Sequence, residues 1–160
     1  WYNADIIVGS KRHPASKINY PVFRKIYSWG YHTFVKILLG VNVKDTQAGL
    51  KVFRREVLEA VLPRLLVKRF AFDIEILAVS KYLGFDRIYE APIKVDWRRC
   101  NSNFTPFLIF DKNILNMIKD TLAVFYRLRI LNYYSDEKKR KWIYDKELDM
   151  RINTGETLNA

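Results

Sequence analysis

The sequence is poor in cysteine. Cys100 is the only one among its 160 residues, so no disulfide can form within the chain. No segment has the composition of a signal peptide, and both features predict a reducing, cytoplasmic setting. Apolar runs are short as well, and none reaches the roughly 20 residues that a membrane-spanning helix needs. These absences exclude a disulfide-stabilised secreted domain and a helical membrane span within these residues.

Several motifs of catalysis and metal binding are missing too. The sequence contains no glycine-rich phosphate loop, no Gly-x-Ser-x-Gly motif and no Asp-x-Asp motif. His13 and His32 stand alone, without a second ligand at the spacing of a metal site. The sequence therefore predicts neither a serine nucleophile of that type nor a zinc or catalytic site built on histidine.

Acidic residues are few. The chain has 17 of them against 28 lysines and arginines, which gives a net charge of +11. The imbalance is concentrated, because residues 1–72 hold 13 of the basic residues and only 4 of the acidic ones. A basic field of this kind indicates an anionic partner, such as phosphate, nucleic acid or an acidic membrane surface, or a surface kept basic for solubility.

What the chain does have is enough apolar sequence for one domain with a packed core: 49% hydrophobic and 15% aromatic residues. Its periodicity predicts strands over residues 4–9, 50–53 and 87–97 and helices over residues 21–39, 56–66, 73–83 and 106–131. Such alternation is typical of an α/β layer structure. Past Tyr134 the sequence is highly charged and then polar, and we expect one further surface helix followed by a disordered tail.

Three side chains near the first predicted strand have the chemistry of a phosphate site. Lys11 follows the strand at its carboxyl end, where open α/β sheets usually bind ligands. Arg24 and Ser28 are four residues apart on the next predicted helix and therefore share a face. Together they can hold a phosphate, because arginine offers a planar guanidinium, lysine a compact charge and serine a neutral hydrogen-bond donor. Alternatively, they are two solvated charges and a surface serine.

Three carboxylates are candidates for chemistry, each with a structural alternative. Asp45 precedes a turn and can simply cap it. Asp73 lies in the first turn of a predicted buried helix, where the helix dipole stabilises negative charge. Glu75 has apolar neighbours on both sides, so its carboxylate is expected either to pair with a buried cation or to face a cleft.

Two longer segments carry a resemblance to a known family. They read DTQAGLKVFRREVLEAVLP from residue 45 and FAFDIEILAVSKYLGFDRIYEAPIKVDW from residue 70. They resemble the second half of family 2 glycosyltransferases, in the branch of dolichyl-phosphate mannose and glucose synthases and bacterial polyprenyl-phosphate glycosyltransferases. The resemblance extends back through ADIIVGSK and forward through KDTLAVFYRLRILNYY, and it covers residues 4–134.

The resemblance implies an α/β fold of the GT-A, Rossmann-like type, followed by amphipathic C-terminal helices. Residues 1–103 would be the C-terminal, acceptor-side half of the glycosyltransferase domain, residues 104–134 an amphipathic interfacial helix, and residues 135–160 a charged polar tail. In this family the nucleotide-sugar donor and a divalent cation, Mg²⁺ or Mn²⁺, bind the N-terminal half, where an Asp-x-Asp motif holds the metal. Because the chain starts at Trp1 without that motif, we expect a C-terminal fragment without a metal site of its own, inactive alone.

The resemblance also implies roles for individual residues. By motif, the cations and hydroxyl that contact the acceptor phosphate and the sugar phosphate are Lys11, Arg24 and Ser28. Asp45 and Gln47 belong to the corner formed by residues 45–49, near the sugar pocket. Asp73 and Glu75 form an acidic pair at the start of a helix. The loop that closes over the phosphates corresponds to residues 97–103, and Ser102 in this loop is a predicted phosphate contact. Asn103 occupies the position where the family has a cation. Either Arg98 or Arg99 takes over the role of that cation, or the cation is lost.

The implied reaction is attack by a polyprenyl phosphate on the anomeric carbon of a UDP- or GDP-sugar, with inversion. A phosphate monoester has a second pKa of about 6, so it is a nucleophile at neutral pH without a strong general base. Asp45 and Gln47 are then expected to orient the sugar hydroxyls or the arginines, and Asp45, Asp73 and Glu75 are the predicted catalytic residues. The main obstacle is the approach of one anion to another, which clustered lysine and arginine would relieve.

A lipid acceptor would also explain the amphipathic pattern of residues 106–131. Such a helix can lie in the membrane interface, on the cytoplasmic face, beside a basic surface attracted to anionic lipid, or it can simply pack against the sheet. Two other functions remain open at this point. One is a non-catalytic, basic membrane-surface binding module, and the other is a nucleic-acid-binding domain, which we do not expect.

Overall fold

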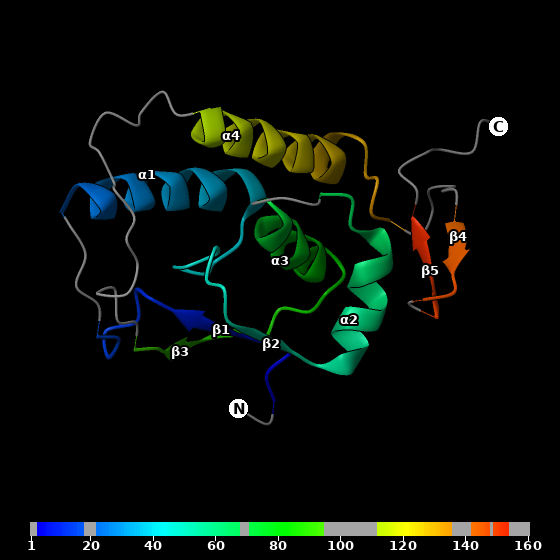
Figure 1. Cartoon of the computed structure of the whole chain (residues 1–160), viewed down its shortest axis with the longest axis horizontal. Coiled ribbons are helices and arrows are strands. Elements are labelled where there is room, and N and C mark those ends of the chain that lie inside the picture. Colours follow the sequence, from blue (N-terminus) through cyan, green and yellow to red (C-terminus); the bar gives the residue numbers. More distant parts are fainter. Residues whose placement is uncertain are drawn as a thin grey trace.

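The computed structural model describes residues 3–17, 22–67, 71–94, 112–135, 142–147 and 149–153. The chain has a mixed α/β fold with a small central sheet (Figure 1). The strands β1 (Ile6–Ser10), β2 (Lys51–Phe53) and β3 (Ile88–Pro92) lie in the order β2-β1-β3. β3 runs parallel to β1 and β2 antiparallel to it, so the carboxyl ends of β1 and β3 meet at the same edge.

The helices of the described residues lie on one side of this sheet (Figure 1). They are α1 (Val22–Leu39), α2 (Arg55–Val61) with the 3-10 turn η1 (Leu62–Arg64), α3 (Phe72–Tyr82) and α4 (Lys112–Phe125) with the π-helical turn η4 (Tyr126–Ile130). α1 and α4 run side by side, and the hydroxyls of Tyr31 and Thr121 join them at 2.8 Å. The expected helices over 21–39, 56–66 and 73–83 are thus confirmed to within a few residues.

Glycine ends two of these helices as the sequence predicts. Gly40 follows α1 with φ +66° and Gly84 follows α3 with φ +92°, a region of backbone conformation that glycine enters without steric cost. Pro63 falls in η1, where α2 gives way to a tighter turn. These local signals set the lengths of the helices that cover the sheet.

The core lies between the sheet and the helices. Ile6 and Val8 of β1 are fully buried on the face that meets the helices, together with Val35 of α1 and Leu77 of α3. Side chains alternate along a strand, so the intervening residues point to the other face. Val52 is 57% exposed there, and in the described part of the chain no helix covers this face.

The further surface helix expected after Tyr134 is wrong for the part that the structure describes. Strands β4 (Trp142–Asp145) and β5 (Met150–Asn153) form an antiparallel hairpin, with Ile143 paired to Ile152. β4 is rich in aromatic and β-branched residues, and in β5 Met150 and Ile152 alternate with Arg151 and Asn153, which favours strand over helix. Asp149 has φ +49° in the connecting turn, a conformation that aspartate tolerates.

Candidate functional site

A polar cluster forms at the carboxyl end of β1, where the sequence places the Gly-Ser-Lys motif. The backbone N–H of Lys11 donates to Oδ2 of Asp45 at 2.9 Å, and Nζ of Lys11 lies 3.7 Å from the same oxygen. The side chain of Asp45 is only 9% exposed, so this carboxylate has little access to water. Lys11 and Asp45, 34 residues apart in sequence, therefore belong to one site.

Arg12 connects this site to α1. Its Nη2 donates to the Oγ of Ser28 at 2.6 Å, and its backbone N–H donates to the Oγ of the buried Ser10. Burial lowers the pKa of Arg12, and the charges of Asp45 and Glu90 oppose that shift. An arginine remains protonated at neutral pH under such a shift, so a guanidinium and a hydroxyl lie together beside Asp45.

Glu90 of β3 fixes the corner that carries Asp45. Its Oε1 accepts the backbone N–H of Lys44 at 2.8 Å and that of Asp45 at 3.3 Å. Glu90 therefore holds the backbone of Asp45, and Asp45 in turn holds Lys11. The three residues form a chain of contacts from β3 to the end of β1, so Glu90 is a positioning residue for the cations.

Glu90→Ala is expected to weaken the binding of an anion at this site, because the corner loses the acceptor for two backbone N–H groups. Glu90→Gln keeps an acceptor oxygen and removes only the charge. In a titration with inorganic phosphate at fixed ionic strength, we expect the Ala variant to bind about tenfold more weakly, the loss typical of about 1.4 kcal/mol. The Gln variant is expected to bind phosphate as well as or better than the wild type. Equal weakening by both variants would contradict the positioning role.

His32 also belongs to this cluster, although the sequence gives no sign of it. Burial, and then the charges of Arg12 and Lys36, lower the pKa of His32, while Glu90 and Asp45 act in the opposite direction. Its Nδ1 is buried and has no hydrogen-bond partner among the described residues. The imidazole is thus neutral at pH 7, and it adds hydrogen-bonding capacity to the site rather than charge.

The structure places Lys11 against Asp45, and Arg12, which the sequence analysis did not single out, links Ser28 to this pair; the phosphate contacts expected of Lys11 and Ser28 stay predictions. Gln47 turns toward α4 instead, where its Nε2 lies 2.9 Å from Sδ of Met117. The backbone of Arg24 is part of α1, but its side chain lies outside the described part. The predicted phosphate contacts of Arg98, Arg99 and Ser102 also lie outside the described residues and stay predictions.

Asp73 forms an ion pair with Lys51. Its Oδ1 lies 2.8 Å from Nζ of Lys51, whose side chain is only 6% exposed and also donates to the carbonyl oxygen of Ala48. Lys51 thereby ties the first turn of α3 to the corner that carries Asp45. These contacts show how Asp73 can support the site, and its catalytic role stays a prediction.

Glu75 is fully buried and has partners on three sides. Its Oε2 accepts the backbone N–H groups of Leu66 and Val67 at 3.0 and 2.8 Å. Its Oε1 accepts the hydroxyl of Tyr134 at 2.5 Å and lies 3.7 Å from Nη2 of Arg127. Of the two alternatives left by the sequence, the structure thus shows pairing with a cation. A catalytic role for Glu75 stays a prediction.

Four functional or supporting residues were missed by the sequence analysis: Arg12, His32, Lys51 and Glu90. One signal was available for Glu90, because it lies two residues after Ile88 and therefore shares the inner face of the strand with it. Such a carboxylate needs partners. The other three are recognisable only from contacts between segments distant in the sequence.

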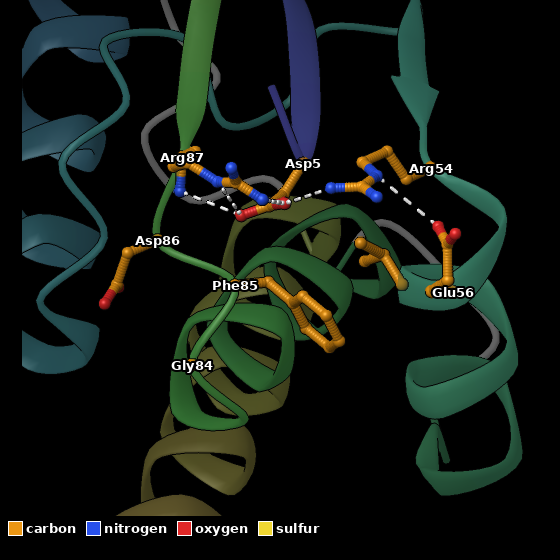
Figure 2. Close-up of a pocket in the computed structure, with 8 residues that line it drawn as sticks. Asp5, Arg54, Glu56, Gly84, Phe85, Asp86 and Arg87 are labelled. Atoms are coloured by element: carbon orange, nitrogen blue, oxygen red, sulfur yellow. Dashed lines mark hydrogen bonds and ion pairs between the residues drawn. The ribbon is translucent and has the colours of Figure 1, made fainter. Parts of the chain in front are cut away.

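A separate cavity of about 500 Å³ lies near the amino end of β1 (Figure 2). Asp5, only 4% exposed, accepts hydrogen bonds from Arg87 and also pairs with Arg54. The hydrogen bond from Arg87 is the main reason that the pKa of Asp5 is lowered. Because these charges satisfy one another, we regard the cluster as a structural tie between β1, β3 and the start of α2.

No group of three or more His, Cys, Asp or Glu residues that could hold a metal occurs within the described ranges. The helices of those ranges also include none that is long and apolar enough to cross a membrane. The candidate site is therefore a cluster of cations, hydroxyls and positioned carboxylates at the sheet edge. Such a cluster suits a phosphate-bearing ligand.

Comparison with known proteins yields relatives that are named as polyprenyl-phosphate glycosyltransferases. The chain is 32% identical over 126 residues to the dolichyl-phosphate β-glucosyltransferase of Dictyostelium discoideum, covering 76% of this chain and 36% of the relative. It is 36% identical over 122 residues to the undecaprenyl-phosphate mannosyltransferase of Micrococcus luteus, covering 75% of this chain and 50% of the relative. For the dolichyl-phosphate β-glucosyltransferase of Homo sapiens the identity is 35% over 129 residues, covering 79% of this chain and 37% of the relative.

The chain spans between about a third and a half of the length of these relatives. Neither a scan against models of protein families nor a search of solved structures gave a match. These three relatives are glycosyltransferases named for a polyprenyl phosphate. The resemblance seen in the sequence is thus confirmed, and the chain is a homologue of family 2 glycosyltransferases over most of its length.

Proposed function

We propose that this chain supplies the acceptor side of a family 2 glycosyltransferase that transfers a sugar from a nucleotide-sugar to a polyprenyl phosphate. The relatives support the general reaction class. The observation that carries the proposal is the meeting of Lys11, Arg12 and Ser28 beside the buried Asp45. The small mixed sheet with helices on one face agrees with part of a GT-A type domain.

In the proposed reaction, an oxygen of the lipid phosphate attacks the anomeric carbon of the sugar. The new carbon–oxygen bond forms while the bond from that carbon to the nucleoside diphosphate breaks, and the diphosphate leaves with the electron pair. A single displacement inverts the anomeric carbon. The phosphate is already ionised at neutral pH, so the step needs no proton transfer from the protein, which agrees with a neutral His32.

The task of the site is then to bring two anions together. Arg12 offers a planar fork and Ser28 a neutral donor to a phosphate, and Lys11 adds a compact charge. Asp45 and Glu90 keep these groups in place by the contacts described above. Donors fixed before the reaction lower its barrier more than mobile ones, because they need no reorganisation when charge shifts to the leaving group.

We propose that the nucleotide-sugar and the divalent cation are bound mainly by residues outside this chain. The described residues do not fit a metal site, so no step is assigned to a metal here. In the relatives' family this cation would stabilise the departing diphosphate. On this proposal the 160 residues alone are expected to show no transfer.

We further propose that α1 and α4 rest on the cytoplasmic surface of a membrane. Large apolar side chains are exposed on both helices: Trp29 and Ile37 on α1, and Leu115 and Leu122 on α4. α1 also carries Ser28, so a helix at the interface would bring the candidate site near a lipid head group. Apolar faces beside a basic protein surface are typical of interfacial helices.

The double variant Ile37→Gln/Leu122→Gln is expected to bind anionic vesicles about tenfold more weakly than the wild type, because two apolar contacts with the interface are lost. Co-sedimentation with phosphatidylserine-containing vesicles measures this. Val52→Gln is a matched control, since Val52 is exposed and pairs with Ile7, on the face of the sheet opposite to the buried Ile6 and Val8. Equal binding by the double variant and the wild type would remove these helices from the interface.

The transfer function is tested with the full-length protein, a panel of labelled sugar nucleotides, and either polyprenyl phosphate or the unphosphorylated polyprenol. The proposal predicts transfer to the phosphate and none to the alcohol, because the cations act on an anionic acceptor. The 160-residue chain serves as the control for activity of this part alone. Failure of every donor with polyprenyl phosphate, or equal transfer to the alcohol, would contradict the proposed function.

A further inference from the structure

A second basic pocket lies beside the candidate site and shares Lys11 with it. A cavity of about 490 Å³ is lined by Lys11, Gly49, Leu50, Ile93 and Lys94. It is formed where β1 and β3 end side by side and β2 begins. The carboxyl edge of parallel strands is the usual location of ligands in α/β folds.

The floor of this cavity depends on Gly9. A Cβ at that position would lie 2.8 Å from Cγ2 of Ile93 and 3.2 Å from Cβ of Leu50, so no side chain fits there without a shift. Ser16 holds the rim, since its hydroxyl donates to the carbonyl oxygen of Ser10 and accepts the backbone N–H of Ile93. The cavity is thus lined by closely packed apolar side chains, Leu50 and Ile93, and by two lysines, Lys11 and Lys94.

The charge around the cavity is strongly positive. Lys17 pairs with Lys94 in an isolated parallel β-bridge, which places two lysines next to each other. Two like charges side by side repel each other, and an anion bound between them would relieve that repulsion. Asp45 pairs with Lys11, whereas neither Lys17 nor Lys94 has an acidic partner among the residues that the structure describes.

We propose that Lys94, with Lys11 and Lys17, forms a second anion subsite that is separate from the one built by Arg12 and Ser28. Its ligand carries a phosphate group, and its apolar part lies on Leu50 and Ile93. The identity of that ligand rests on the proposed function, in which two phosphate-bearing molecules react. Each of them needs cations near the reacting carbon, and two adjacent subsites joined at Lys11 provide for both.

The subsite itself is tested by titrating the full-length protein with inorganic pyrophosphate at fixed ionic strength, by calorimetry. Lys94→Met is expected to raise the pyrophosphate Kd about tenfold, equivalent to about 1.4 kcal/mol. Lys146→Met is the matched control, because Lys146 is likewise exposed but lies in the turn of the β4–β5 hairpin. Thermal unfolding checks that both variants are folded. Unchanged affinity in a folded Lys94→Met protein would overturn the proposal.

Steady-state kinetics then separate the two sources of phosphate. A rise in KM for the sugar nucleotide alone assigns the subsite to the donor diphosphate, and a rise for polyprenyl phosphate alone assigns it to the acceptor. If the protein transfers no sugar but Lys94→Met still weakens pyrophosphate binding, the subsite stands and the proposed function fails. If transfer occurs and Lys94→Met changes neither KM nor pyrophosphate affinity, the subsite fails and the proposed function stands.

Discussion

Replacing Arg12 by methionine is expected to lower kcat/KM for polyprenyl phosphate by about 100- to 1,000-fold, the loss typical of removing one preorganised donor from an active site. Arg12 is the cation that contacts Ser28, and its half-buried guanidinium lies beside Asp45 and Glu90. Methionine keeps much of the apolar stem and removes the whole fork. Initial rates with the full-length protein, at varied concentrations of acceptor and a saturating donor, measure the effect.

Two further variants make this result specific. Arg12→Lys keeps the charge but not the planar fork, so we expect it to recover part of the lost activity. Arg55→Met is the control, because the Arg55 side chain is 88% exposed and pairs with Glu59 on the surface of α2. If Arg12→Met retained wild-type kcat/KM, Arg12 would have no part in the acceptor site. An equal loss in Arg55→Met would point to net charge rather than to the site.

Glu75→Ala is expected to destabilise the protein by about 3–5 kcal/mol, the usual cost of breaking a buried ion pair by removing one partner. The variant leaves three donors without their acceptor, the N–H groups of Leu66 and Val67 and the Tyr134 hydroxyl, and it removes the carboxylate that pairs with the Arg127 guanidinium. Equilibrium unfolding in urea, followed by circular dichroism, gives the change in the free energy of unfolding.

The accompanying variants separate charge from shape. Glu75→Gln retains an acceptor for the backbone N–H groups and should lose less stability than Glu75→Ala. Glu59→Gln removes a carboxylate from an exposed pair on α2 and is expected to leave the midpoint almost unchanged. A Glu75→Ala protein as stable as the wild type would show that the buried contacts contribute little, and the carboxylate would then have to be explained by function.

Much of the fold could be predicted from local sequence. Gly40 and Gly84 end their helices because the chain needs a positive φ there, and the apolar run before Lys11 is a buried strand. The hairpin of β4 and β5 was missed because charged residues outnumber apolar ones in that region and conceal the alternation of Met150 and Ile152 with polar residues. The order β2-β1-β3 was not predicted either, since strand pairing depends on contacts between distant residues.

The candidate site was predicted only in part, for the same reason. Lys11, Ser28 and Asp45 were identified through their motifs, and the structure places all three in one cluster. The contact between Arg12 and Ser28 spans 16 residues, and that between Glu90 and the backbone of Asp45 spans 45. No local pattern reports such contacts. Glu75 shows the converse case, because its sequence environment allowed either a cleft or an ion pair and only the position of Arg127 decides between them.

The central claim is that the cations of this chain let a lipid phosphate displace a nucleoside diphosphate from a sugar carbon. The most direct measurement uses full-length protein, polyprenyl phosphate and a sugar nucleotide labelled with ¹³C at the anomeric carbon. The account predicts a lipid product in which that carbon is coupled to phosphorus in the NMR spectrum, with the configuration opposite to that of the donor. A product with retained configuration, or with the labelled carbon bonded to anything other than the lipid phosphate oxygen, would contradict it.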